Sequence, residues 1–267
     1  MQSAQLGWKS RLRGAGALFV VGMLGVAALA VQTVPALRDV PGLEGLSYPM
    51  LLLAAGANSA VLLAVFAVIG ALTAPRVDLR SNLFAGATNT GPDWTALRES
   101  LPRAVGLGVG LFLLTAVLDL AFTPFITIDA GPATTAAESL RALYSSVPMR
   151  LLYGGITEEI LLQWGLMAPV AWLGWRVRGR PEAGLGSATM WVAIVVSAVL
   201  FGVGHLPALA SAYGLTPLLI VRTVLLNAIV GLAFGWLFWR DSLETAMVAH
   251  ATFHVALVAV STALILA

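Results

Sequence analysis

The residues of this chain that can take part in acid–base or metal chemistry gather in its second half. Two adjacent carboxylates, Glu158 and Glu159, stand in the otherwise apolar run Gly155-Ile-Thr-Glu-Glu-Ile-Leu-Leu-Gln-Trp-Gly165. A charged group at membrane depth costs about 2.5–3.5 kcal/mol on insertion scales, so an intramembrane carboxylate indicates a function by default. Because neighbouring residues of a helix point about 100° apart, the two side chains cannot both lie on one helix face, and the rest of the chain must supply their partners.

All three histidines of the chain also fall inside apolar segments. His205 ends the sequence Phe201-Gly-Val-Gly-His205, while His250 and His254 are spaced i and i+4 and therefore share one helix face. A lone buried histidine is often a hydrogen-bonded core residue, but that explanation suits five ionisable groups in one bundle poorly. One chemistry open to such a set is a proton relay in a transporter.

The overall composition predicts that these groups act within a membrane. The 267 residues are 59% hydrophobic and 10% charged, whereas a soluble domain has about 25% charged residues. Cysteine is absent, which excludes disulfides, cysteine metal sites and a cysteine nucleophile. The formal net charge is only +2, and the basic residues are spread along short loops, so we expect no nucleic-acid partner.

The elements that must position the ionisable residues are transmembrane helices. A hydrocarbon core of about 30 Å requires about 20 apolar residues per helix. On that basis the sequence predicts an all-α, polytopic bundle of about seven helices, with the site in the last four. The predicted spans are 15–34, 49–74, 102–124, 148–174, 188–209, 216–239 and 243–266. Within the connection 126–147, Leu140, Leu143 and Tyr144 recur at helical spacing and indicate a short amphipathic helix at the membrane interface.

Charge asymmetry predicts the orientation of the bundle. The N-terminal segment and the connections after the second, fourth and sixth spans hold most of the basic residues, so the positive-inside rule predicts a cytoplasmic N-terminus and an external C-terminus. Lys9 is the single lysine beside many arginines, and Ala, Gly and Val are abundant, which hints at a bacterial genome rich in G and C. We therefore expect a multi-pass protein of the cytoplasmic membrane.

Three short patterns, in order along the chain, resemble the motifs of the CPBP family. These are the CAAX-protease and bacteriocin-processing membrane proteases, also called Abi proteins, which are relatives of the type II CAAX prenyl endopeptidases. The patterns are Glu158-Glu159 with polar Gln163, Phe201-x-x-x-His205, and His250-x-x-x-His254, and the run that begins at Asn227 also resembles the family's approach to its third motif. The resemblance covers about residues 146–258.

The resemblance divides the chain and marks two departures. Residues 1–125 are N-terminal transmembrane helices without a recognised motif, and residues 126–267 are the CPBP-like catalytic core, within one continuous membrane domain. The family usually has arginine where this chain has Gln163, which can hydrogen-bond but cannot form an ion pair. It usually has Asn or Asp where this chain has His254, which can donate a hydrogen bond and can also bind a metal.

The family resemblance implies an intramembrane endopeptidase acting on membrane-embedded or lipid-anchored peptides and proteins. Glu158 is then the candidate general base that activates a water molecule. The resemblance assigns His205 to the same water, and His250 with position 254 to the developing oxyanion. Glu159 points to another face, where we expect it to orient a neighbouring group or to act as a second acid. Gln163 and Asn227 are expected to support the site.

A metal-dependent mechanism is the alternative chemistry. His205, His250 and His254 would then bind zinc, and a glutamate would activate the metal-bound water. The chain has no HExxH motif to decide the question, and we favour the metal-independent version. The alternative functions are a proton-coupled transporter and a non-catalytic CPBP-like scaffold. The bilayer is an expected partner in each case, and the sequence leaves the oligomeric state open.

The predicted spans place one residue at an awkward depth. Glu158 and His205 lie toward the outer ends of antiparallel spans, whereas His250 lies only about seven residues, or roughly 10 Å, into the last span. His250 can meet the other residues only if its helix starts deeper, if residues 241–249 re-enter the membrane, or if the helices tilt.

Overall fold

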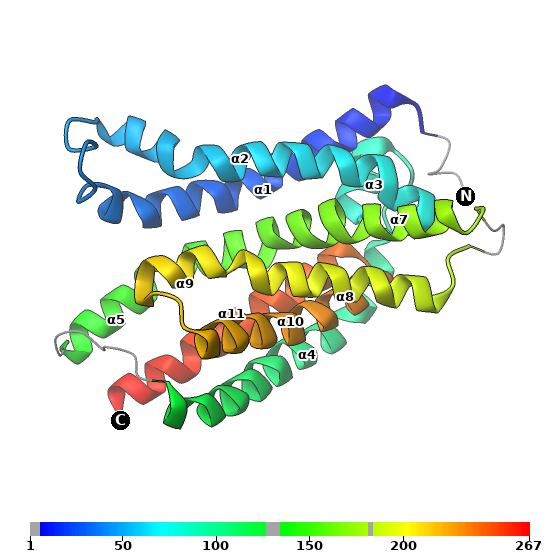
Figure 1. Cartoon of the computed structure of the whole chain (residues 1–267). Helices are drawn as coiled ribbons and strands as arrows, with labels where there is room; N and C mark the ends of the chain where they lie inside the picture. The colour runs from blue at the N-terminus through cyan, green and yellow to red at the C-terminus, as the bar shows by residue number, and fades with distance from the viewer. Residues whose placement is uncertain (1–5, 127–133, 181–183) are drawn as a thin grey trace.

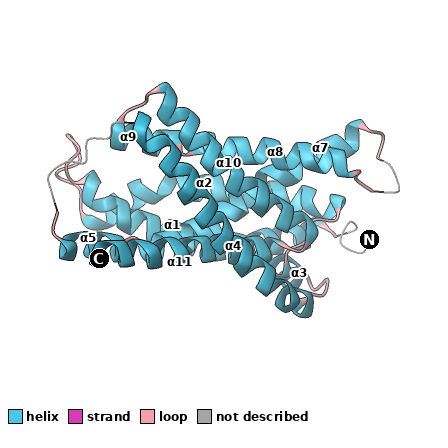
Figure 2. Ribbon diagram, turned by 90° about the horizontal axis from the view of Figure 1, so that it is seen from below, coloured by secondary structure: helices cyan, strands magenta, loops and turns pink. Residues whose placement is uncertain are grey.

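Every secondary-structure element of the described chain is a helix. The computed structural model describes residues 6–126, 134–180 and 184–267. The long helices are α1 (Trp8–Leu37), α2 (Tyr48–Thr73), α4 (Trp94–Phe122), α8 (Ser187–Gly204), α10 (Pro217–Arg240) and α11 (Leu243–Leu266). The shorter ones are η2 (Ala74–Val77), α3 (Asn82–Thr88), η3 (Thr123–Phe125), α5 (Ala136–Ser145) and α9 (Leu206–Tyr213). Figure 2 shows these helices joined by loops.

The long helices run alongside one another as a bundle, with the start of α1 and the end of α11 at opposite ends of the molecule (Figure 1). Within the described residues, six helices are long and apolar enough to cross a membrane: α1, α2, α4, α8, α10 and α11, three of them extended by the short helical segments that follow them. The prediction of an all-α polytopic bundle is confirmed. The predicted count of seven is not confirmed by this criterion, because the region of the fourth predicted span is built differently.

That region, Val147–Val177, is a run of consecutive helical segments rather than one α-helix. It consists of α6 (Val147–Met149), two π-helices, η4 (Arg150–Glu158) and η5 (Ile160–Met167), and α7 (Ala168–Val177). It extends along the bundle from the end marked by α5 to the end marked by α7 (Figure 1). π-Helices bond residue i to i+5, are rare, and occur frequently at functional sites. The two adjacent glutamates lie where η4 ends and η5 begins.

The N-terminal helices α1 and α2 brace this run. The Thr157 hydroxyl donates to the Gly22 carbonyl at 2.7 Å, and the indole N–H of the fully buried Trp164 donates to the Ala67 carbonyl at 3.2 Å. The packing is so close that a Cβ added at Gly70 would lie 2.0 Å from the Trp164 ring. The segment without a recognised motif therefore positions the helix that carries the glutamates, and both share one hydrophobic core.

The start of α11 is covered by the connection between α2 and α4. The backbone N–H of Leu243 donates to the Arg80 carbonyl at 3.0 Å, and Leu243, Glu244 and Thr245 are all buried. Glu244 accepts a hydrogen bond from the Ser81 hydroxyl at 2.6 Å and another from the Leu83 backbone N–H at 3.0 Å. The first turn of α11 therefore begins inside the protein.

The predicted short helix within 126–147 is present as α5. Thr135 and Glu138 form a capping box at its N-terminus, in which each side chain accepts the other's backbone N–H. The helix packs against the end of α11, where the Thr262 hydroxyl donates to the Tyr144 hydroxyl at 3.2 Å. Residues 127–133 of this connection lie outside the described residues.

Candidate active site

The centre of the site is His250, which lies between the two adjacent glutamates. Its Nδ1 is 2.8 Å from Oε1 of Glu159, and its Nε2 is 3.9 Å from Oε2 of Glu158. Glu159 and His250 are buried, whereas the Glu158 side chain is 19% exposed. Adjacent residues of a helix point in different directions, and here each carboxylate faces a different nitrogen of the same imidazole. One side chain from α11 thus gives both glutamates a partner.

Aromatic rings hold the His250 imidazole in place. The Phe234 ring from α10 stacks on it with centroids 4.7 Å apart, and the His254 ring, one turn further along α11, stacks at 5.0 Å. Phe201 from α8 lies edge-on at 6.1 Å. Side chains from three helices therefore restrain the orientation of the His250 ring, in addition to its hydrogen bond with Glu159.

His254 fits because residue 154 has no side chain. A Cβ added at Gly154 would lie 2.6 Å from Nε2 of His254 and 3.6 Å from Nε2 of His250. The Nδ1 atom of His254 is buried and has no hydrogen-bond partner. Arg150, whose Nε donates to the Ser146 hydroxyl at 2.9 Å, and His205 are close enough to His254 to interact with it electrostatically. The site therefore includes a cation at the start of the glutamate-bearing helix.

His205 lies at the junction of α8 and α9. Its Nδ1 is 2.9 Å from the Phe201 carbonyl oxygen, and its ring lies edge-on to the Phe201 ring with centroids 4.6 Å apart. Because a carbonyl can only accept, Nδ1 carries the proton, and a neutral His205 keeps a lone pair on Nε2. Phe201 contacts both His205 and His250, so it connects the second motif to the third.

The two supporting residues of the prediction are placed less centrally. Gln163 is buried, and its Oε1 has no hydrogen-bond partner. This oxygen packs against Gly235 of α10, where an added Cβ would lie 3.2 Å from it. Asn227 donates from Nδ2 to the Thr223 carbonyl at 2.8 Å, within its own helix. In the described part of the chain, neither amide has a hydrogen bond to the glutamates or histidines of the site.

The start of α11 is enclosed by the protein, because the helix begins beneath the segment around Arg80 and Ser81. His250 and the glutamates are thereby at the same level, as the 2.8 Å contact with Glu159 requires.

The side chains as placed do not form a zinc site. In the described ranges, which include all three histidines, no three His, Asp or Glu side chains are arranged to hold a metal ion. Nδ1 of His205 and Nδ1 of His250 are occupied by the Phe201 carbonyl and by Glu159. The zinc-dependent mechanism stays an alternative prediction beside the metal-independent one.

Sequence reasoning missed three kinds of contributor to the site. Gly154 provides space, Phe201 and Phe234 hold the rings, and Arg150 adds a cation. The signal for the first was visible in the paired glycines just before the glutamates, because glycine inside a helix needs a packing or functional reason. Phe201 stood in the second motif without a role of its own, and Phe234 had no such signal, since phenylalanine is common in apolar helices.

The fold and the site together define a helical membrane protein with a buried Glu–His cluster. Residues 141–256 match the family model of the type II CAAX prenyl endopeptidase Rce1-like proteins. This segment contains both glutamates and all three histidines, and the match supports the predicted resemblance of these residues to the CAAX-protease (CPBP) family. No curated protein and no solved structure matches the chain. The family supports an intramembrane protease kind of function.

Proposed function

We propose that this protein is an intramembrane endopeptidase in which Glu158 activates the hydrolytic water and Glu159 positions His250. The observation that carries the proposal is the placement of one imidazole between two adjacent carboxylates. A buried histidine with a purely structural role needs only one carboxylate partner. Here the second nitrogen faces a second, partly exposed carboxylate.

The unequal burial of the glutamates supports their different roles. Glu159 is enclosed and within hydrogen-bond distance of Nδ1 of His250, so it is a positioning residue that orients the ring. The Glu158 side chain is 19% exposed and is therefore the carboxylate that a substrate can reach. The 3.9 Å between Glu158 and Nε2 of His250 is too long for a direct hydrogen bond and suits a reacting group held between them.

Each step of the proposed hydrolysis uses a group of the site. Glu158 takes a proton from water while the water oxygen forms a bond to the peptide carbonyl carbon, and the carbonyl π electrons move to oxygen. Nε2 of His205 accepts a hydrogen bond from the remaining O–H of this water. N–H groups of His250 and His254 donate hydrogen bonds to the oxyanion. The oxyanion then re-forms the carbonyl, the C–N bond breaks, and Glu158 returns its proton to the leaving amine.

The substrate class follows from the location of the site among apolar helices. We propose that it is a membrane-embedded or lipid-anchored peptide or protein. The type II CAAX prenyl endopeptidases for which the matching family is named make a prenylated tail the first candidate to test.

The test reconstitutes the purified protein in liposomes with quenched fluorescent peptides, one farnesylated on cysteine and one identical but unmodified. Comparing the membrane proteomes of cells with and without the protein extends the search to other anchored substrates. Glu158→Gln and His205→Ala should fold normally and lose cleavage. Cleavage that persists in Glu158→Gln would contradict the proposed mechanism. A flux that depends on a pH gradient and is abolished by the same variants would favour a transporter.

A further inference from the structure

A second pocket lies where the end of α2 and η2 meet α7, away from the Glu–His cluster. Its volume is about 600 Å³. Its lining consists of the residues Ile69, Leu72, Thr73, Arg76, Trp172, Trp175, Arg176 and Arg180. The proposed protease mechanism uses none of these residues.

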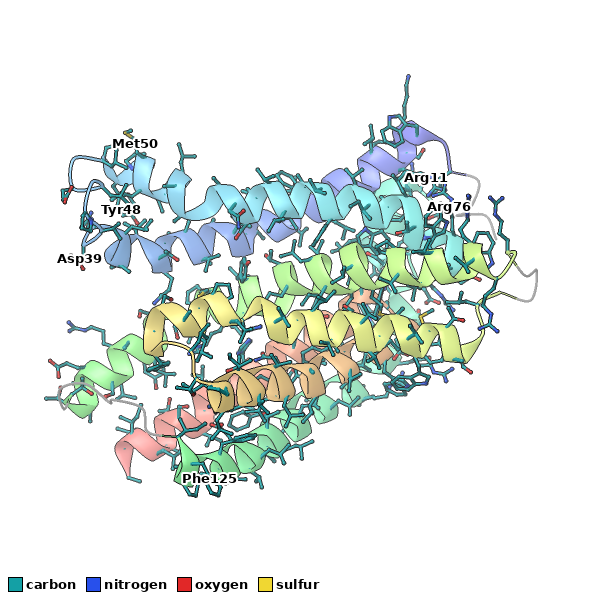
Figure 3. All side chains as sticks on the ribbon, viewed as in Figure 1. Arg11, Asp39, Tyr48, Met50, Arg76 and Phe125 are labelled. Carbon is teal, nitrogen blue, oxygen red and sulfur yellow. The ribbon has the colours of Figure 1, made fainter. Side chains whose placement is uncertain are left out.

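Three arginines converge on this pocket from two segments about a hundred positions apart in the sequence. Arg76 comes from η2, Arg176 lies in the last turn of α7, and Arg180 follows the end of that helix. Among the described residues, none of the three guanidinium groups has a carboxylate partner. Arg11 of α1 is close enough to Arg76 to repel it, and Figure 3 shows both at the same end of the molecule. Net positive charge of this kind attracts an anion.

Trp172 adds a hydrogen-bond donor to the same pocket. The Arg176 guanidinium lies 5.3 Å from the centre of the Trp172 ring, in a cation–π arrangement. The indole Nε1 of Trp172 is buried and has no hydrogen-bond partner. A buried donor without an acceptor is unfavourable. If the exposed Arg176 side chain changes rotamer, an anion bound to it can place an oxygen next to the Trp172 indole N–H. That oxygen would then accept the hydrogen bond that Trp172 now lacks.

The remaining walls of the pocket indicate what kind of anion enters it. Ile69 and Leu72 are apolar and belong to a helix that is long and apolar enough to cross a membrane, so they continue into its apolar surface. Tryptophans such as Trp172 and Trp175 are typical of the level of the lipid headgroups. The ligand thus meets guanidinium groups on one side and hydrocarbon on the other. This combination suits an amphiphile with a phosphate head and an acyl tail.

We propose that this pocket binds the phosphate headgroup of an anionic membrane lipid. Guanidinium groups match the oxygens of a phosphate with paired N–H donors, and basic pockets between transmembrane helices bind lipid headgroups in this way. Bound lipid would link α2 to α7. Arg176 is 17 residues from Glu159, roughly 25 Å along the helical run, so the bound lipid would not touch the catalytic groups.

The test titrates short-chain phosphatidylglycerol into the protein in an uncharged detergent and measures binding by calorimetry. The matched pair of variants is Arg176→Gln and Arg240→Gln, because Arg240 also lies over a tryptophan, Trp239, at 4.1 Å, but outside the pocket. Arg176→Gln should weaken binding about fivefold and Arg76→Gln/Arg176→Gln roughly 30-fold. Arg240→Gln should leave binding within about twofold of wild type, as expected for a residue that lies outside the site.

Two further arms identify the source of the phosphate. Short-chain phosphatidylcholine should bind much more weakly, and inorganic phosphate at the same concentration should not compete. Retention of phosphatidylglycerol on the native protein in the mass spectrometer gives a second readout that needs no variant. The proposal is overturned if Arg240→Gln and Arg176→Gln weaken binding equally, if phosphatidylcholine binds as well as phosphatidylglycerol, or if inorganic phosphate displaces the lipid.

Discussion

Two buried carboxylates, Glu159 and Glu244, have similar exposure but very different surroundings. Glu159 is 1% exposed and is hydrogen-bonded to the His250 imidazole, whose other nitrogen faces a second carboxylate. Glu244 is 7% exposed and accepts hydrogen bonds from the Ser81 hydroxyl and from the backbone of Leu83, at the start of α3. In each residue the Oε2 atom has no hydrogen-bond partner.

Burial alone therefore does not identify a functional carboxylate. The partners of Glu244 are a hydroxyl and a backbone amide, which do not change protonation near neutral pH, so this residue joins a loop to a helix. The partner of Glu159 can change its charge and lies beside a carboxylate that is partly open. The nature of the partner therefore distinguishes a structural carboxylate from a candidate catalytic one.

Replacing each buried carboxylate by its amide should separate the two roles most sharply. We expect Glu159→Gln to lower the rate of peptide cleavage by about 10²–10⁴-fold, because a neutral amide replaces the charged acceptor that orients the His250 ring. Glu244→Gln should leave the rate within about twofold, because its surroundings do not touch the reacting groups. Cleavage of the fluorescent peptides in liposomes measures both. Equal losses in the two variants would remove the distinction between the two carboxylates.

Filling the space beside His254 should have the next largest effect. In Gly154→Ala the new Cβ would lie 2.6 Å from Nε2 of His254, so one of the two must move. A displacement of about 1 Å can lower a rate by about 100-fold, and we expect a loss of that size. Gly110→Ala in α4 is the matched control, because nothing lies within 4 Å of its added Cβ. An active Gly154→Ala protein would show that His254 has no fixed position in catalysis.

Removing the hydroxyl that serves Glu244 should affect stability and leave activity intact. Ser81 donates to Glu244 and also accepts the Phe84 backbone N–H as the N-cap of α3. We expect Ser81→Ala to lower the free energy of unfolding by about 1–3 kcal/mol, because it leaves buried polar groups unpaired. Thermal unfolding in detergent measures this, with the exposed Ser145→Ala as control. A loss of cleavage at full stability would instead connect this network to the active site.

The smallest effect is expected at an exposed carboxylate, Glu138 of α5, where we expect only the local stability of that helix to change. Hydrogen bonds from the Thr135 backbone and side chain hold the pKa of Glu138 below its ordinary value of 4.5. A lowered pKa in the folded state means that the carboxylate stabilises α5 above pH 4.5, and that this stabilisation is lost as the pH falls through the lower, folded value. The protection of the α5 amides, measured against their intrinsic exchange rates at each pH, should therefore fall on acidification, and this fall should be absent in Glu138→Gln. If the pH dependence of exchange in α5 is unchanged in Glu138→Gln, it arises from the titration of another group.

The class of the fold and the candidate site residues could be predicted from the amino-acid sequence alone. Apolar runs of about 20 residues specify membrane helices, since the backbone polar groups must be satisfied within each helix. Ionisable residues are costly inside such runs, so Glu158, Glu159, His205, His250 and His254 were recognisable without any structure. The i, i+4 spacing of the last two was sufficient to place them on one face.

Only the tertiary structure decided which partner each of these residues has. The angle between Glu158 and Glu159 follows from helical geometry, but which of them is enclosed depends on where α11 packs. The level of His250 depends on the buried start of α11 beneath Ser81, a contact across more than 160 positions. The convergence of Arg76 with Arg176 has the same origin. Local periodicity specifies the faces of a helix, whereas contacts between distant segments are chosen by the packing of the whole bundle.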